Sequence, residues 1–168
     1  MARLGAQVTA IDPSEECIAE AKAHAVISGL SNKIDYRVNT VDKELSLDTR
    51  YDVVLASEVI EHVPHQEQFI KDCFNISNHS LIVSTISRTP KAYAVVILAA
   101  EYLTRILPRA THDYNKFITP QEMKNMIGRA GGNVLCVNGI VFNPMQSVDR
   151  MVLSEGDFDV NYIVHASK

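Results

Sequence analysis

Apolar and polar positions along the chain follow two periods, one typical of strands and one typical of helices. Residues 51–57, with the sequence YDVVLAS, form a continuous apolar run of the kind that is buried on both faces of a parallel sheet. Residues 33–39 alternate as a half-buried strand does. The same reasoning predicts further strands at residues 7–11, 80–86, 133–142 and 159–166.

Helical patterns follow two of these predicted strands, residues 7–11 and residues 51–57. Residues 13–28 are predicted to form a helix that Asp12 or Ser14 caps and that ends before Gly29. Residues 66–74 are predicted to form another helix directly after the apolar run. Each strand and the helix that follows it therefore make a β–α unit.

The second half of the chain departs from simple alternation. Residues 90–107 predict an apolar, partly amphipathic helix that Pro108 stops, and Thr119 and Glu122 have the spacing of a capping box for a later helix. Strands that alternate with helices indicate an α/β fold with a largely parallel sheet and helices on both faces, and the last two strands suggest an antiparallel edge. Residues 1–168 are predicted to form a single domain.

Composition excludes several classes of protein. The formal charge of −4 and the scattered Lys and Arg residues argue against nucleic acid as a partner. Cys17, Cys73 and Cys136 are far apart and odd in number, so they are expected to be core residues in a reducing compartment. The longest uncharged run, residues 92–100, is far shorter than the roughly 20 residues of a spanning helix. The first residues lack the pattern of a signal or transit peptide.

Polar residues stand where two predicted strands end, which is where open α/β sheets bind ligands. Asp12 either accepts hydrogen bonds from ribose hydroxyls or simply caps the next helix. Glu58, Glu61 and His62 would share one face if a helix has begun by Glu58, and two carboxylates with one imidazole could then hold a divalent cation. The alternative is a solvated helix face with ordinary charges. The protease signature H-E-x-x-H is absent.

Several segments resemble one enzyme family in their order and spacing. The chain is similar over nearly all of its length to the ubiquinone-biosynthesis O-methyltransferases, the polyprenyldihydroxybenzoate and demethylubiquinol methyltransferases that include the mitochondrial type. The resemblance is carried by the segments VTAIDPS, YDVVLASEVIEHV, ATHDYNKFITPQEM, FNP and DVNYIVHA.

This resemblance implies a fold, a cofactor and a metal. The fold would be the Rossmann-like sheet of class I S-adenosylmethionine-dependent methyltransferases. By the resemblance, Asp12 and Ser57 would contact S-adenosylmethionine, and Glu58, Glu61 and His62 would bind a metal. That metal is expected to be Mg²⁺, although such a donor set also accepts Zn²⁺ or Mn²⁺.

The resemblance is incomplete at the start of the chain. Family members begin with a strand and a Gly-rich loop that approaches the methionine end of the cofactor, whereas this chain starts at the following helix, near Arg3, Leu4 and Gly5. The chain is therefore expected to be an N-terminally truncated form that lacks a central strand and half of the cofactor site. Poor binding of S-adenosylmethionine by the 168-residue chain alone would follow.

The implied reaction is methylation of a catechol hydroxyl. A free phenol has a pKa of about 10, so a cation held by Glu58, Glu61 and His62 would favour the phenolate and orient it toward the sulfonium methyl group. His62 as general base is a second possibility, although a nitrogen bound to a metal cannot accept a proton. His112, next to Asp113, is a further candidate for a catalytic residue, with a structural role as its alternative.

The lipid tail of the family's substrate suggests a membrane-facing element. Residues 90–118 are interpreted as a helical insertion whose helix, with Arg105 and Arg109, either packs in the core or docks on a membrane interface. The implied location is peripheral, on the matrix side of the mitochondrial inner membrane, or cytoplasmic if the protein is bacterial. The implied partners are a polyprenylated catechol and other ubiquinone-biosynthesis proteins in a complex.

Two other classes of protein stay open from the sequence. A nucleotide-dependent oxidoreductase would also use an acid such as Asp12, but it would leave Glu58, Glu61 and His62 unexplained. A non-catalytic assembly subunit of a biosynthetic complex would fit a chain without the glycine-rich loop.

Overall fold

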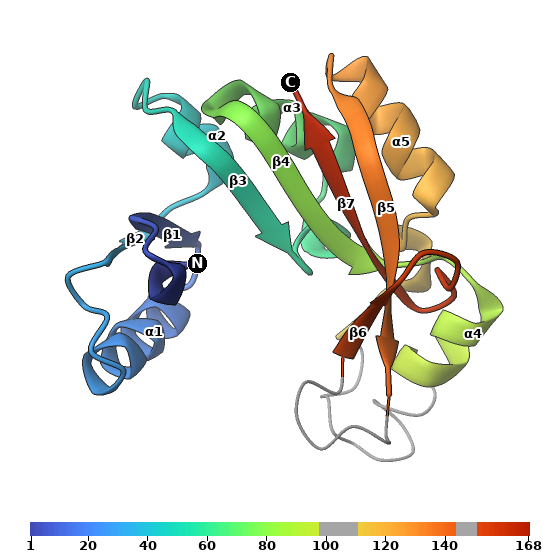
Figure 1. Cartoon of the computed structure of the whole chain (residues 1–168), viewed down its shortest axis with the longest axis horizontal. Helices are drawn as coiled ribbons and strands as arrows, with labels where there is room; N and C mark the ends of the chain where they lie inside the picture. Colours follow the sequence, from blue (N-terminus) through green and yellow to red (C-terminus); the bar gives the residue numbers. More distant parts are fainter. Residues whose placement is uncertain (98–110, 144–150) are drawn as a thin grey trace. The chain divides into compact units, whose positions relative to one another are not determined.

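A computed structural model describes residues 1–97, 111–143 and 151–168 of the chain. The chain divides into two compact units, Met1–Thr49 and Arg50–Lys168 (Figure 1). Each unit is described by itself below. The prediction of a single domain for the whole chain stays a prediction.

The first unit is a β–α–β arrangement. Its elements are η1 (Ala2–Leu4), β1 (Val8–Asp12), α1 (Glu15–Ile27), β2 (Ile34–Val38) and α2 (Val41–Leu45). β1 and β2 pair in parallel, with Val8 opposite Ile34. The Ser14 hydroxyl accepts a hydrogen bond from the Cys17 backbone N–H at 3.2 Å, so Ser14 is the residue that caps α1. The predicted β–α unit is confirmed.

The second unit is built on a mixed sheet. Its elements are β3 (Tyr51–Ser57), η2 (Ile60–His62), α3 (Gln66–Ile76), β4 (Ser77–Ile86), α4 (Pro90–Ala92), η4 (Tyr114–Lys116), α5 (Pro120–Arg129), β5 (Asn133–Phe142), β6 (Met151–Ser154) and β7 (Asn161–Ser167). The strand order is β3-β4-β7-β5-β6 (Figure 1). β3 and β4 are parallel, whereas β7 is antiparallel to both of its neighbours. Helices α3 and α5 contact the sheet and each other, so they cover the same face.

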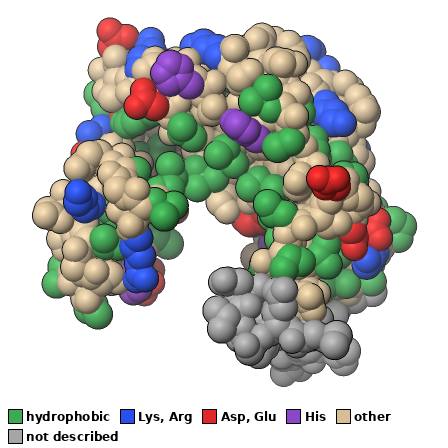
Figure 2. Space-filling view, in the orientation of Figure 1, with side chains coloured by type: hydrophobic (Ala, Val, Ile, Leu, Met, Phe, Trp, Pro, Cys, Tyr) green, Lys and Arg blue, Asp and Glu red, His purple; other side chains and the backbone are tan. Residues whose placement is uncertain are grey.

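The expectation for the final pair of strands is confirmed in part. β5 and β7 pair antiparallel as predicted, but β7 lies between β4 and β5, and the edge belongs to β6, which the sequence pattern missed. Within the second unit, β3 is the first strand of the sheet order and pairs with β4, and its Val53 and Leu55 are 38% and 46% exposed. Burial of β3 on both faces of a complete sheet stays a prediction. Figure 2 shows hydrophobic side chains that reach the surface over this sheet.

The cysteines also differ from the expectation. All three are free, as predicted, but only Cys73 is buried, whereas Cys17 and Cys136 are exposed. Cys17 stands in the first turn of α1, most of whose residues face solvent, and Cys136 lies beside an irregularity in the pairing of β5 with β7. Burial raises the pKa of the Cys73 thiol to about 12, so this side chain is a core residue rather than a reactive one.

The helix predicted at residues 90–107 is described only in part. Thr89 caps α4, and a wider π-helical turn continues over residues 93–97, while residues 98–110, including Arg105 and Arg109, lie outside the described residues. Ala92 and Ile97 are buried in a cluster with other apolar side chains, whereas Tyr93 and Val95 are exposed. In the part of the chain that the structure describes, no helix is long and apolar enough to cross a membrane.

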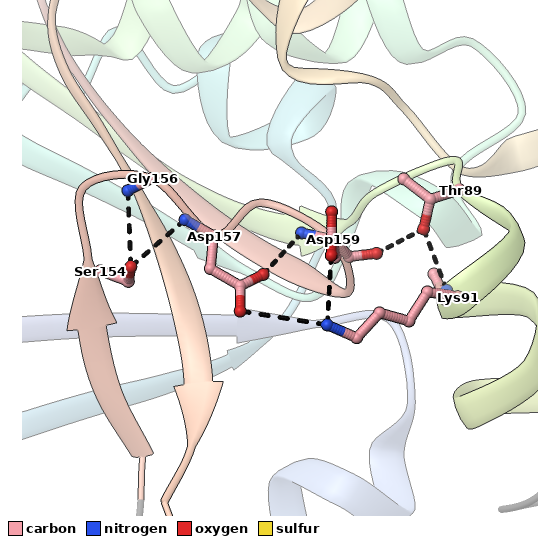
Figure 3. Close-up of polar contacts among 7 residues, drawn as sticks. Thr89, Lys91, Ser154, Gly156, Asp157 and Asp159 are labelled. Atoms are coloured by element: carbon pink, nitrogen blue, oxygen red, sulfur yellow. Dashed lines mark hydrogen bonds and ion pairs between the residues drawn. The ribbon is translucent and has the colours of Figure 1, made fainter.

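A turn between β6 and β7 holds the start of α4 (Figure 3). Lys91 is 3.1 Å from Asp159 and 4.0 Å from Asp157, and the Thr89 hydroxyl donates a hydrogen bond to the Asp159 carbonyl. The Ser87 N–H donates to the Val160 carbonyl at 2.7 Å. These contacts tie the first turn of α4 to the sheet.

Candidate active site

Three strands bring polar side chains to one edge of the second sheet. β3 and β4 are parallel, so their carboxyl ends lie at the same edge, with Ser57 opposite Ser84. β7 runs the other way, and its first residue, Asn161, pairs with Ile86 at the end of β4. The site therefore combines the ends of two strands with the beginning of a third.

Glu58 turns the chain sharply out of β3. Its backbone is left-handed, with φ of 53°, which is uncommon for a residue with a side chain. Its N–H donates to the Ser84 carbonyl at 3.0 Å and lies 3.2 Å from the Ser84 hydroxyl. No helix has begun at Glu58, because η2 covers only Ile60–His62. The expected single helical face with spacing i, i+3, i+4 is therefore wrong.

The Glu58 carboxylate nevertheless points into the site. Its Oε2 accepts a hydrogen bond from Asn161 Nδ2 at 2.8 Å, across 103 positions of sequence. Burial raises the pKa of Glu58, and the negative charge of Glu61 raises it further, while hydrogen bonds from Ser84 and Asn161 oppose the shift. Glu58 and Glu61 are thus close enough to repel each other.

Glu61 is the more deeply buried carboxylate. It is only 2% exposed, and its Oε2 accepts a hydrogen bond from the Thr85 hydroxyl at 2.9 Å. Its Oε1 is buried without any hydrogen-bond partner among the described residues. Burial raises the pKa of Glu61. A buried carboxylate oxygen without a hydrogen-bond donor is costly unless a ligand supplies a donor or a positive charge.

Two histidines border the carboxylates. The rings of His62 and His112 are 5.5 Å apart between centroids, and His112 also lies 6.1 Å from the Phe117 ring. Burial lowers the pKa of His62, and the positive charges of His112 and Lys116 lower it further. His112 also acts electrostatically on Glu58 and Glu61. His112, the predicted catalytic histidine, therefore lies near His62 and close enough to Glu58 and Glu61 to influence their charges.

The donor set suits a divalent cation by its chemistry, although it does not form a closed coordination group. Within residues 1–97, 111–143 and 151–168, no three His, Cys, Asp or Glu side chains are arranged so that they could hold a metal ion. The unpartnered Oε1 of Glu61 and the neighbouring Glu58 carboxylate are the groups that a cation would neutralise.

The two predicted cofactor residues lie in different units. Asp12 ends β1, and its Oδ1 accepts a hydrogen bond from the Ser14 N–H at 2.7 Å. Asp12 therefore holds the backbone of Ser14, the residue that caps α1, and does not itself cap the helix. Contact with a ribose stays a prediction. Ser57 ends β3, where its hydroxyl lies 3.2 Å from the Ser84 hydroxyl.

Sequence reasoning missed the residues that hold the carboxylates. Ser84 and Thr85 are buried at the end of β4, and Asn161 stands at the start of β7. A signal for the first two was present, because polar residues interrupt the apolar strand in SLIVSTIS. No local pattern links Asn161 to Glu58, since only the antiparallel placement of β7 brings them together.

Comparisons with known proteins agree with this geometry. A family model described as a methyltransferase domain matches residues 1–137. Ubiquinone biosynthesis O-methyltransferases from Rhodopseudomonas palustris (strain HaA2), Arabidopsis thaliana (named as mitochondrial) and Marinobacter nauticus are 46%, 38% and 40% identical over 98%, 100% and 99% of this chain. The chain belongs to this methyltransferase family.

The match covers only part of the relatives. The chain spans 63% of the Rhodopseudomonas protein, 52% of the Arabidopsis protein and 70% of the Marinobacter protein. Among solved structures, magnesium protoporphyrin IX methyltransferase (ChlM) from Synechocystis PCC 6803 with bound SAH aligns with a TM-score of 0.69 and 16% identity, covering 99% of this chain and 66% of that one. At that identity the likeness shows the fold, which is that of class I S-adenosylmethionine-dependent methyltransferases.

Proposed function

We propose that the protein containing this chain transfers a methyl group from S-adenosylmethionine to a catechol hydroxyl of a polyprenylated dihydroxybenzoate or demethylubiquinol. Membership of the ubiquinone biosynthesis O-methyltransferase family supports the reaction class and the cofactor. The observation that carries the proposal is the buried Glu61 beside Glu58, His62 and His112, at the sheet edge where this fold binds ligands.

The chain's own residues would act on the acceptor oxygen. On the family resemblance alone, Glu58, Glu61 and His62 would hold a divalent cation once their side chains converge on it, and its charge would favour the phenolate form of a catechol. His112, which lies against His62, is the candidate acceptor of the phenolic proton. In the transfer, an oxygen–carbon bond forms as the carbon–sulfur bond of the sulfonium breaks, so negative and positive charge cancel. Glu61 is buried, so water has little access to its carboxylate.

A chelator experiment tests the metal part of this proposal. Methyl transfer to a short-chain polyprenyl dihydroxybenzoate would be measured with the complete native polypeptide after dialysis against EDTA and after addition of Mg²⁺. We expect activity to disappear on chelation and to return with Mg²⁺, while circular dichroism shows an intact fold. Full activity of the metal-free enzyme would contradict the metal assignment and leave His112 as the base of a metal-independent reaction.

The cofactor assignment gives a separate prediction. If Asp12 accepts hydrogen bonds from the ribose of S-adenosylmethionine, Asp12→Ala should weaken binding by about 1–3 kcal/mol, measured by titration calorimetry on the complete native polypeptide. Asp35→Ala is the matched control, because Asp35 is an exposed carboxylate on β2 that pairs with Arg37. Unchanged affinity in Asp12→Ala would leave this residue with its hydrogen bond to Ser14 as its only role.

Membrane association and location are parts of the same proposal. Exposed Tyr93 and Val95 near the start of the predicted insertion support docking on a lipid surface that carries the polyprenylated substrate. The Arabidopsis relative is named as mitochondrial, which supports a mitochondrial location. The matrix side of the inner membrane, or the cytoplasm if the protein is bacterial, is proposed on the family resemblance alone. A complex with other ubiquinone-biosynthesis proteins is proposed on the family resemblance alone.

A further inference from the structure

One side chain joins the two short turns beside which the histidines of the candidate site lie. Gln66 is the first residue of α3, and its amide nitrogen donates to the Ile60 carbonyl at 3.3 Å and to the Lys116 carbonyl at 2.7 Å. Ile60 belongs to η2, which also holds His62, whereas Lys116 ends η4, 50 positions after Gln66. Gln66 therefore bridges two turns that are distant in the sequence.

A glutamine amide suits this bridge because its nitrogen carries two hydrogens, and each can go to a different carbonyl. The two contacts also fix the orientation of the Gln66 amide, since the opposite orientation would place its own oxygen against two carbonyl oxygens. A side chain of the same size without these hydrogens cannot make the bridge.

Local hydrogen bonds shape each turn but do not set the distance between the turns. In η2 the His62 N–H donates to the Val59 carbonyl at 2.9 Å, and in η4 the Lys116 N–H donates to the Asp113 carbonyl at 2.9 Å. After η4, the Ile118 N–H donates to a carbonyl of β4 at 3.2 Å, which ties that end of the segment to the sheet. The Gln66 bridge adds the link from η4 to η2.

The placement of η4 matters for the proposed reaction. His112 immediately precedes Asp113, the residue that caps η4, and its ring lies 5.5 Å from the ring of His62. Misplacement of a catalytic group by about 1 Å can cost about 10²-fold in rate. We propose that Gln66 is a positioning residue that holds His112 beside His62, where His112 can accept the phenolic proton. This inference rests on the proposed function of the same site.

The experiment replaces the Gln66 amide in the complete native polypeptide. Gln66→Glu keeps the size of the side chain but removes both donor hydrogens, and Gln66→Met removes the polar group. In both variants we expect kcat for methyl transfer to fall about 10–100-fold, because the proton acceptor is displaced. The KM of the catechol and the affinity for S-adenosylmethionine should stay the same, since the loss falls on the transition state.

Hydrogen exchange gives a second measurement that does not depend on the reaction. The N–H groups of Lys116 and Phe117 close η4 through hydrogen bonds of 2.9 and 3.2 Å. Both amides should exchange faster in the two Gln66 variants, because a turn without its link to η2 opens more often.

Controls separate positioning from a general loss of stability. Gln68, in the same helix, donates one amide hydrogen bond to Asp72 at 2.8 Å, so Gln68→Met also loses a hydrogen bond but should keep kcat and the exchange rates in η4. His112→Ala should lose at least as much activity as either Gln66 variant. Normal kcat in both Gln66 variants, or an equal loss in Gln68→Met, would overturn this inference alone. Full activity of His112→Ala would overturn the proposed role of His112, and this inference with it.

Discussion

Glu61→Gln should lower the rate of catechol methylation by about 10²–10³-fold in the complete native polypeptide, the usual effect of removing one electrostatic contact to the reacting oxygen. The reason is that Glu61 is buried, 2% exposed, and presents at the sheet edge an oxygen that has no hydrogen-bond partner among the described residues. S-adenosylmethionine affinity should change little, because the carboxylate acts on the acceptor rather than on the cofactor. The measurement is steady-state transfer of a labelled methyl group, together with cofactor binding by calorimetry.

The same substitution should stabilise the metal-free protein. Burial raises the pKa of Glu61 above its ordinary value of 4.5, so the folded state disfavours the ionised form. The resulting loss of stability is absent below the ordinary pKa, and it appears as the pH rises through the raised pKa. Thermal unfolding of Glu61→Gln should therefore match the unaltered chain near pH 4 and exceed it at neutral pH.

A matched substitution separates this effect from a general loss of charge. Glu67 in α3 is a glutamate whose carboxylate pairs at the surface with Arg129, at 3.0 Å, and it lies outside the site. Glu67→Gln should leave methylation unchanged, and exposed ion pairs contribute only about 0–1 kcal/mol to stability. If Glu61→Gln proved fully active, Glu61 would be a buried structural carboxylate and the cluster would have no role in turnover.

Local sequence patterns predicted the parts of the site that depend on neighbours in the chain. The apolar run ending at Ser57 became β3, and Thr119 and Glu122 form the predicted capping box, with hydrogen bonds of 3.2 and 2.9 Å. Both features are decided within a few residues, by a continuous apolar run in the first case and by one side chain that reaches one backbone N–H in the second.

The rest of the site depends on contacts between distant segments. The left-handed backbone of Glu58 follows from its hydrogen bonds to Ser84 on the next strand. The period of apolar positions in the sequence contains no information about such a contact. Glu58, Glu61 and His62 therefore do not share one helical face as expected, although tertiary packing still places them near one another. Asn161 became a neighbour of Glu58 because β7 inserts between β4 and β5, an order that the final strands do not encode locally.

Gly139→Ala should destabilise the chain by about 3 kcal/mol, at the upper end of the usual cost of overpacking. A Cβ at Gly139 would lie 1.5 Å from the Asp157 carbonyl oxygen and 2.5 Å from its carbon. These are backbone atoms, so no side-chain rotation relieves the overlap. Gly139 is also paired on both sides, with Ser154 on β6 and Tyr162 on β7, so β5 cannot easily move away.

Relief of that overlap would require the turn around Asp157 to lift from β5, and this turn holds α4. Lys91 contacts Asp157 and Asp159, so its ion pairs should loosen with the turn (Figure 3). Urea unfolding measures the loss of stability, and hydrogen exchange should increase at residues 89–92.

Gly128→Ala is the matched control, because Gly128 is exposed in α5 and a Cβ there meets nothing within 4 Å. That substitution should raise stability by about 0.5–1 kcal/mol through helix propensity. Equal stability of Gly139→Ala and the unaltered chain would mean that the turn does not rest on β5, and that the sheet alone does not fix the start of α4.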